Sequence, residues 1–110
     1  MVGNIYFIDM PYSDFKQFKG RPVLVFRMID KNDLLVLPLT TNLSRDGILI
    51  TNSDISKGLL RKESVIIIPK ITSIDSTLIS NNNFIASLKT KSFDRVLDKI
   101  CNKLDCGERI

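Results

Sequence analysis

The sequence predicts a mainly β protein in which a curled antiparallel sheet is closed on one side by a single C-terminal helix. The first observation is a series of short apolar runs rich in β-formers, separated by turn residues such as Pro, Gly, Asn and Asp. The second is one amphipathic stripe near the C-terminal end. The third is that strands and helices do not alternate along the chain as they do in parallel sheets.

Length and composition bound the class of protein. A chain of 110 residues that is 44% hydrophobic and 25% charged fits one globular domain, so we expect a single domain over residues 1–110. No apolar run approaches the roughly 20 residues of a membrane helix. Residues 1–4 show no signal-peptide pattern, and we expect a cytoplasmic protein. The net charge of +4 suits a polyanion such as nucleic acid, although excess lysine also promotes solubility.

The predicted strands follow the β-branched and aromatic runs. They are expected at residues 5–9, 23–29, 34–39, 48–51, 63–69, 71–75 and 84–88. The runs at 23–29 and 34–39 are almost continuously apolar, which indicates burial on both faces of a wrapped sheet. Residues 30–33 form a turn between them, 11–20 and 52–58 are predicted loops, and 76–79 one helical turn. Pro38 is expected at an edge or exit position because proline has no N–H to donate to a neighbouring strand.

One helix is predicted near the end of the chain. Phe93, Val96, Leu97, Ile100 and Leu104 fall on one apolar stripe, with charged and polar residues on the other face. Either Thr90 or Ser92 is expected to cap its N-terminus. The stripe is therefore assigned to the core.

The chemistry available to the chain is limited by the absence of histidine. Ser-His-Asp triads, Cys-His pairs and histidine-based RNase mechanisms are excluded. Cys101 and Cys106 lack the CxxC spacing of redox and zinc sites, so we expect no metal and no cofactor. Arg21 stands between Gly20 and Pro22, and the proline holds it extended at a predicted loop-to-strand junction. Taken alone, this arginine fits an ordinary surface cation better than it fits a functional group.

Several segments occur in an order that resembles one known family. They are 3–6 (GNIY), 10–14 (MPYSD), 19–25 (KGRPVLV), 37–42 (LPLTTN), 58–65 (GLLRKESV) and 70–75 (KITSID). With the closing helix they look like the MazF/PemK toxins of type II toxin–antitoxin systems, over residues 3 to about 104. This resemblance implies a small SH3-like antiparallel β-barrel of the MazF/PemK/CcdB kind, a homodimer, a cognate antitoxin partner and growth inhibition by metal-independent cleavage of single-stranded RNA.

The resemblance also implies site residues. The family's arginine before proline falls on Arg21 and its strand-end threonine on Thr40, which makes these two the expected catalytic residues. Arg21 suits stabilisation of a phosphorane-like transition state while the substrate's own 2′-hydroxyl attacks the phosphorus. Asp14 and Gln17 are candidates to assist proton removal, and the sequence does not choose between them.

The expected RNA-binding residues flank the catalytic pair in the sequence. They are Tyr12, Phe15, Lys16, Gln17, Phe18, Lys19 and Thr41. The aromatic members either stack on bases or anchor the loop, and the lysines either follow the RNA backbone or keep the loop soluble. Two rival functions stay open: a gyrase-poisoning toxin on the same fold, which needs neither Arg21 nor Thr40, and a non-catalytic SH3-like binding module.

Overall fold

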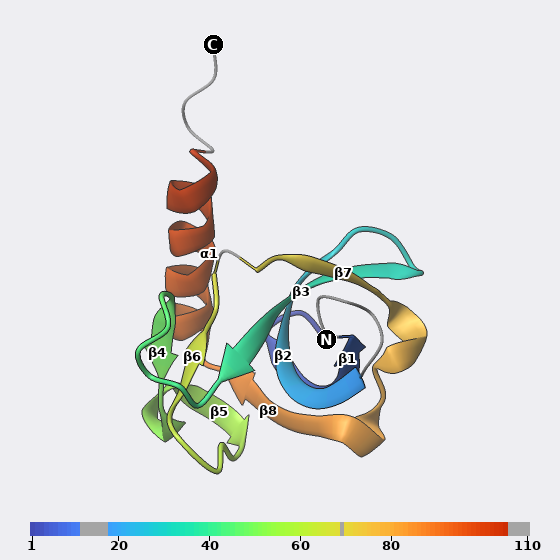
Figure 1. Ribbon diagram of the computed structural model, residues 1–110, viewed down its shortest axis with the longest axis horizontal. Helices are drawn as coiled ribbons and strands as arrows, with labels where there is room; N and C mark the ends of the chain where they lie inside the picture. Colours follow the sequence, from blue (N-terminus) through green and yellow to red (C-terminus); the bar gives the residue numbers. More distant parts are fainter. Residues whose placement is uncertain (12–17, 69, 106–110) are drawn as a thin grey trace.

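The computed structural model describes residues 1–11, 18–68 and 70–105, with only the backbone described at residues 10, 11, 18 and 19 (Figure 1). The strands are β1 (Asn4–Pro11), β2 (Phe18–Met28), β3 (Asp33–Thr40), β4 (Ile48–Ile50), β5 (Ile55–Gly58), β6 (Ser64–Ile66), β7 (Thr72–Asp75) and β8 (Phe84–Leu88). The α-helix is α1 (Thr90–Leu104), and the 3-10 turns are η1 (Asn52–Asp54), η2 (Ser76–Leu78) and η3 (Asn81–Asn83). None of the described helices is long and apolar enough to cross a membrane.

The strands form one antiparallel sheet in the order β4-β6-β3-β2-β1-β8-β5, with β7 alongside the first half of β3. Register shifts interrupt the pairings of β1 with β8, β2 with β3 and β5 with β8. Such bulges increase local twist and bend strands, which allows the sheet to curl on itself. Figure 1 shows the curl, with α1 beside β4 and β6. The predicted mainly β fold with a C-terminal helix is confirmed.

Both faces of the central strands are buried, as the continuous apolar runs predict. Leu24 and Leu37 lie in a cluster that includes Val96 and Ile100 of α1. Val23 and Val36, the next residues in the alternation, lie in a second cluster with Tyr6, Ile8 and Ile74. Side chains alternate between sheet faces, so one set packs against the helix and the other fills the inside of the curl.

The helix buries most of its predicted stripe. Val96 and Ile100 are buried and Phe93 and Leu97 half-buried, but Leu104 is 60% exposed at the last position. The expected cap at Thr90 or Ser92 is wrong, because Lys89 occupies the N-cap position without a side-chain hydrogen bond. The hydroxyl of Ser92 instead donates a hydrogen bond to Asp54 Oδ1 at 2.8 Å. Ser92 therefore uses its hydroxyl in a tertiary contact rather than in capping the helix.

Asp54 fastens η1 to the helix. Its carboxylate accepts hydrogen bonds from Thr51 N–H (2.9 Å) and from Ser92, and Arg95 Nη2 lies 3.3 Å away. Burial would raise the pKa of Asp54, but the hydrogen bonds from Thr51 and Ser92 and the charge of Arg95 outweigh it and leave the pKa below its ordinary value. The carboxylate form therefore stabilises the folded state.

We expect Asp54→Asn to lower the free energy of unfolding by about 1–2 kcal/mol near neutral pH, because charge-assisted hydrogen bonds weaken. A depressed folded-state pKa contributes stability above the unfolded-state pKa and loses it as pH falls through the folded-state value. The difference in the free energy of unfolding between wild type and variant should therefore shrink below about pH 4. Urea unfolding of both proteins between neutral and acid pH measures this difference. Asp98→Asn, an exposed helix position, is the matched control, and an unchanged difference at acid pH would contradict the assignment.

Several boundaries differ from the expectation. Residues 11 and 18–20, predicted as loop, belong to strands, because Pro11 pairs with Phe18 and Asp9 with Gly20 in a long β1–β2 hairpin. The predicted loop 52–58 contains η1 and β5, which is held by pairing with β8. Among residues 63–68, which the structure describes, the strand predicted at 63–69 is regular over Ser64–Ile66, where β4 and β3 pair with it.

Pro38 is not at an edge. It is buried within β3, opposite Val23, at the point where pairing with β7 has ended at Val36 and pairing with β6 has not begun. A residue without an N–H fits this gap, and its carbonyl accepts a hydrogen bond from Ile67 N–H at 2.9 Å. The sequence shows the proline, but it does not show that β3 changes its partner from β7 to β6 at this position.

Candidate functional site

The candidate site begins where the β2–β3 ladder ends. Val23 and Pro38 are the outermost pair. Extending this register by two residues beyond the ladder matches Arg21 with Thr40, and both residues line the same cleft. On its other side, Arg21 pairs with Ile8 of β1, so its backbone is held within the sheet. The predicted loop-to-strand junction at Arg21 is therefore wrong: the arginine lies inside β2. Pro22 is tolerated there because the ladder to β3 begins one residue later.

Arg21 and Thr40 line one small cleft of about 180 Å³. The remaining lining residues are Gly20, Pro22, Leu39, Thr41 and Ser64. Both Arg21 and Thr40 are half-buried. Within the described part of the chain, the Arg21 guanidinium has neither an acidic partner nor a hydrogen bond. Its N–H donors are therefore available to a ligand in the cleft.

The hydroxyl of Thr40 is also able to donate a hydrogen bond to a ligand. Its oxygen accepts a hydrogen bond from Asn42 N–H at 3.1 Å, which fixes the turn that follows β3. Asn42 in turn accepts from the N–H and hydroxyl of Ser44, at 3.2 and 2.7 Å. Because accepting a hydrogen bond leaves the hydroxyl proton unused, Thr40 can still donate to a ligand.

A close approach of β1 to β2 lies next to the cleft, at Gly20. A Cβ atom on Gly20 would lie 2.4 Å from the ring of Phe7, so the ring lies directly against the glycine backbone. Phe7 is 51% exposed and also pairs with Pro22 across the hairpin. Glycine at position 20 thus lets an exposed aromatic ring cover the strand next to Arg21.

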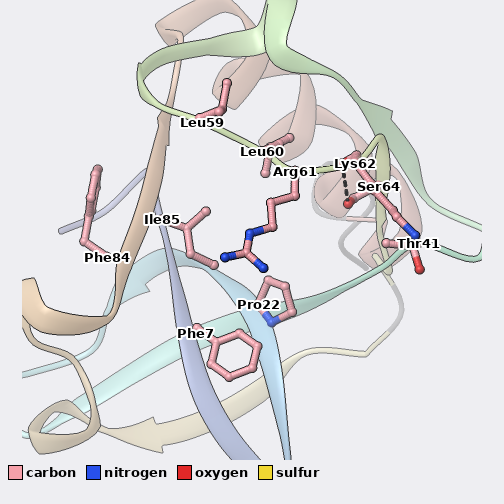
Figure 2. A pocket seen from close by; sticks show the side chains of 10 residues that line it. All are labelled: Phe7, Pro22, Thr41, Leu59, Leu60, Arg61, Lys62, Ser64, Phe84 and Ile85. Atoms are coloured by element: carbon pink, nitrogen blue, oxygen red, sulfur yellow. Dashed lines mark hydrogen bonds between the residues drawn. The ribbon is translucent and has the colours of Figure 1, made fainter.

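A larger pocket of about 740 Å³ adjoins the cleft and shares Pro22, Thr41 and Ser64 with it (Figure 2). The other lining residues are Phe7, Leu59, Leu60, Arg61, Lys62, Phe84 and Ile85. Most of this wall is apolar, and the charged side chains on it are the cations Arg61 and Lys62. Among the described residues, no carboxylate lines either cavity. The combined site therefore favours a ligand with planar apolar parts and negative charge.

The connector between β5 and β6, residues 59–63, supplies much of that pocket and is held firmly. Leu60 is buried in the core, and the Asn52 side chain binds its backbone twice, donating to the carbonyl (2.9 Å) and accepting from the N–H (2.8 Å). Leu59 N–H donates to Ile85 O at 3.3 Å, and the buried Ser64 hydroxyl donates to Lys62 O at 3.1 Å. These contacts fix the backbone on both sides of Arg61.

The structure brings together three of the residues expected from the sequence: Arg21, Thr40 and Thr41. Tyr12, Asp14, Phe15, Lys16 and Gln17 lie outside the described residues. Phe18 and Lys19 belong to β2, opposite Pro11 and Met10, with their side chains outside the described part.

Sequence reasoning missed Arg61, Lys62 and Ser64. The signal was present in paired cations that follow Gly58-Leu59-Leu60, but cations in a connector usually indicate only a solvated surface. Across residues 1–11, 18–68 and 70–105, no group of three or more His, Cys, Asp or Glu side chains is arranged to hold a metal ion.

Comparison with solved structures places this architecture among MazF toxins. *Mycobacterium tuberculosis* toxin MazF-mt6 has a TM-score of 0.65 at 20% identity, covering 93% of this chain and 96% of that one. The MazE-MazF structure from *Deinococcus radiodurans* has a TM-score of 0.63 at 15% identity, covering 94% of each chain. No curated protein matches the sequence significantly. Residues 1–104 match the PemK-like, MazF-like toxin of type II toxin-antitoxin systems, and the chain belongs to this family.

Proposed function

We propose that this protein is a toxin that cleaves single-stranded RNA without a metal ion. The observation that carries the proposal is the convergence of Arg21 and Thr40, from two neighbouring strands, on one cleft that none of the described carboxylates lines. Membership of the PemK/MazF toxin family supports the toxin role. The cationic and hydroxyl donors suit a phosphodiester, whose charge grows on its oxygens during reaction.

In the proposed reaction, the 2′-oxygen of the substrate attacks the adjacent phosphorus and forms a new P–O bond. The bond from phosphorus to the 5′-oxygen of the next nucleotide breaks, and this oxygen takes up a proton from Arg21 or from water, leaving a 2′,3′-cyclic phosphate and a 5′-hydroxyl. Arg21 stabilises the charge on the non-bridging oxygens through its guanidinium fork. Thr40 donates a hydrogen bond from its hydroxyl to a phosphate oxygen and helps to orient the attack. Asp14 and Gln17 remain the candidates for handling the 2′-hydroxyl proton.

The proposal includes the setting of the reaction. We place the protein in the cytoplasm as a single toxin domain that forms a homodimer and is held in check by a cognate antitoxin. Support comes from the family and from the *D. radiodurans* neighbour, a MazE-MazF structure. Activity released from the antitoxin would inhibit growth by degrading mRNA.

The test is incubation of the purified protein with end-labelled single-stranded RNA in excess EDTA. We expect cleavage at preferred sites, with 2′,3′-cyclic phosphate and 5′-hydroxyl ends identified by their response to phosphatase and polynucleotide kinase. Added antitoxin should suppress it. Intact RNA with correctly folded protein would exclude the proposed activity, and inhibition of DNA gyrase by the same preparation would favour the gyrase-poisoning alternative.

A further inference from the structure

The pocket beside the cleft combines apolar walls with positive charge at its edge. At about 740 Å³ it lies within the range of roughly 300–1,000 Å³ that is typical of small-molecule sites. Phe7, Pro22 and Ile85 give it apolar walls. Phe84 stands at its far side, with the Lys57 ammonium 5.9 Å from the ring centroid. A ligand held here would meet flat apolar surfaces inside and positive charge at the edge.

Arg61 is the polar group that reaches into this pocket. Figure 2 shows its guanidinium extending from the connector toward Pro22, beside Ile85. None of the described residues accepts a hydrogen bond from it or pairs with its charge. A guanidinium plane stacks on aromatic rings and also donates to oxygen and nitrogen acceptors. It therefore matches a planar group with acceptors along its edge.

The position of the pocket next to the Arg21–Thr40 cleft indicates which planar ligand it binds. It shares Pro22, Thr41 and Ser64 with the Arg21–Thr40 cleft, so a group seated in the pocket is continuous with whatever occupies the cleft. A phosphate in the cleft and a planar base in the pocket are neighbouring parts of one nucleotide chain. The cations Arg61 and Lys62 complement the charge of the connecting backbone.

We propose that this pocket binds an unpaired nucleobase next to the phosphate held at Arg21, and that Arg61 determines which base is accepted. This inference rests on the proposed RNA-cleaving function and adds a base-recognition site to it. The connector is already fixed by Asn52 and Ser64, so Arg61 is presented to the base before it arrives. Single-stranded RNA is read in this way, by stacking on side chains and by hydrogen bonds to base edges.

Two measurements test the proposal on the intact protein. The first sequences the fragment ends produced from a random single-stranded RNA pool by wild type, Arg61→Ala and the control Arg45→Ala, an exposed arginine that lines neither cavity. The second measures, by fluorescence anisotropy, binding of a labelled short RNA pool made uncleavable by 2′-O-methyl groups. Leu59→Ala and Leu43→Ala, both exposed leucines, provide a second matched pair, of which only Leu59 lines the pocket.

We expect Arg61→Ala to lose the preference for one nucleotide next to the cut and to bind the uncleavable RNA about tenfold more weakly. Leu59→Ala should weaken binding less, and both controls should stay within about twofold of wild type. Circular dichroism and thermal melting establish that the variants are folded.

The outcomes separate the two proposals. Wild-type cleavage with an Arg61→Ala variant of unchanged preference and affinity would overturn the base site and leave the proposed function standing. Arg61-dependent RNA binding without any cleavage by wild type would support the base site and overturn the enzymatic function. If Arg61→Ala leaves RNA binding unchanged but weakens antitoxin binding, the pocket is a protein-docking site and the base assignment is wrong.

Discussion

Replacing Arg21 with Ala is expected to lower the rate of RNA cleavage by about 10²- to 10³-fold or more, the effect of removing a donor that stabilises charge in a transition state. The physical reason is the position of the guanidinium, which shares the cleft with Thr40 and makes no hydrogen bond or ion pair with the described residues. For the same reason the free energy of unfolding should change little. Single-turnover cleavage of one RNA substrate, together with urea unfolding, measures both effects.

Two further variants show whether charge or geometry matters at this position. Arg21→Lys keeps the positive charge but loses the planar fork, so we expect partial activity between wild type and Arg21→Ala. Arg27→Ala removes an exposed arginine from the same strand, away from both cavities, and should leave the rate within about twofold. Full activity in Arg21→Ala would exclude Arg21 from the reaction, whatever the other variants show.

Replacing Gly58 with Ala is expected to lower the free energy of unfolding by about 2–5 kcal/mol, because backbone strain and overpacking add. The backbone of Gly58 has a φ of +84°, which side chains other than glycine rarely adopt. An added Cβ would also lie 2.2 Å from Ile85 O and 2.8 Å from Ala86 Cα, across the β5–β8 pairing. Urea unfolding measures the loss, and RNA binding should weaken with it, since Gly58 leads directly into the connector that carries Arg61.

Gly3→Ala is the matched control for the backbone strain. Gly3 has a similar φ of +88°, but among the described residues a Cβ there would meet only the Phe93 ring, at 4.0 Å. We expect this variant to be less destabilised than Gly58→Ala, and the difference between the two isolates the close approach of β5 to β8. Equal losses at the two positions would mean that strain alone, rather than this approach, accounts for the effect.

The sequence by itself determined the fold class and most of the core. Alternation along short β-branched runs is a local property, and it predicted the strands at Ile48–Ile50, Thr72–Asp75 and Phe84–Leu88 to within a residue or so. The continuous apolar runs of β2 and β3 predicted burial on both faces, and the helical stripe predicted α1. The named site pair, Arg21 and Thr40, came from a family resemblance that spans almost the whole chain.

Only the tertiary structure decided how these residues meet. Arg21 and Thr40 are neighbours because of the β2–β3 register, and a register is set by packing and bulges rather than by either strand alone. Arg61 lines the adjoining pocket because Asn52 holds the backbone of Leu60, a contact that the sequence alone does not show. Hydrogen bonds between separate segments depend on the folded path of the chain. Local sequence patterns therefore located the strands and the helix, while the pocket next to the cleft followed from the way the sheet curls.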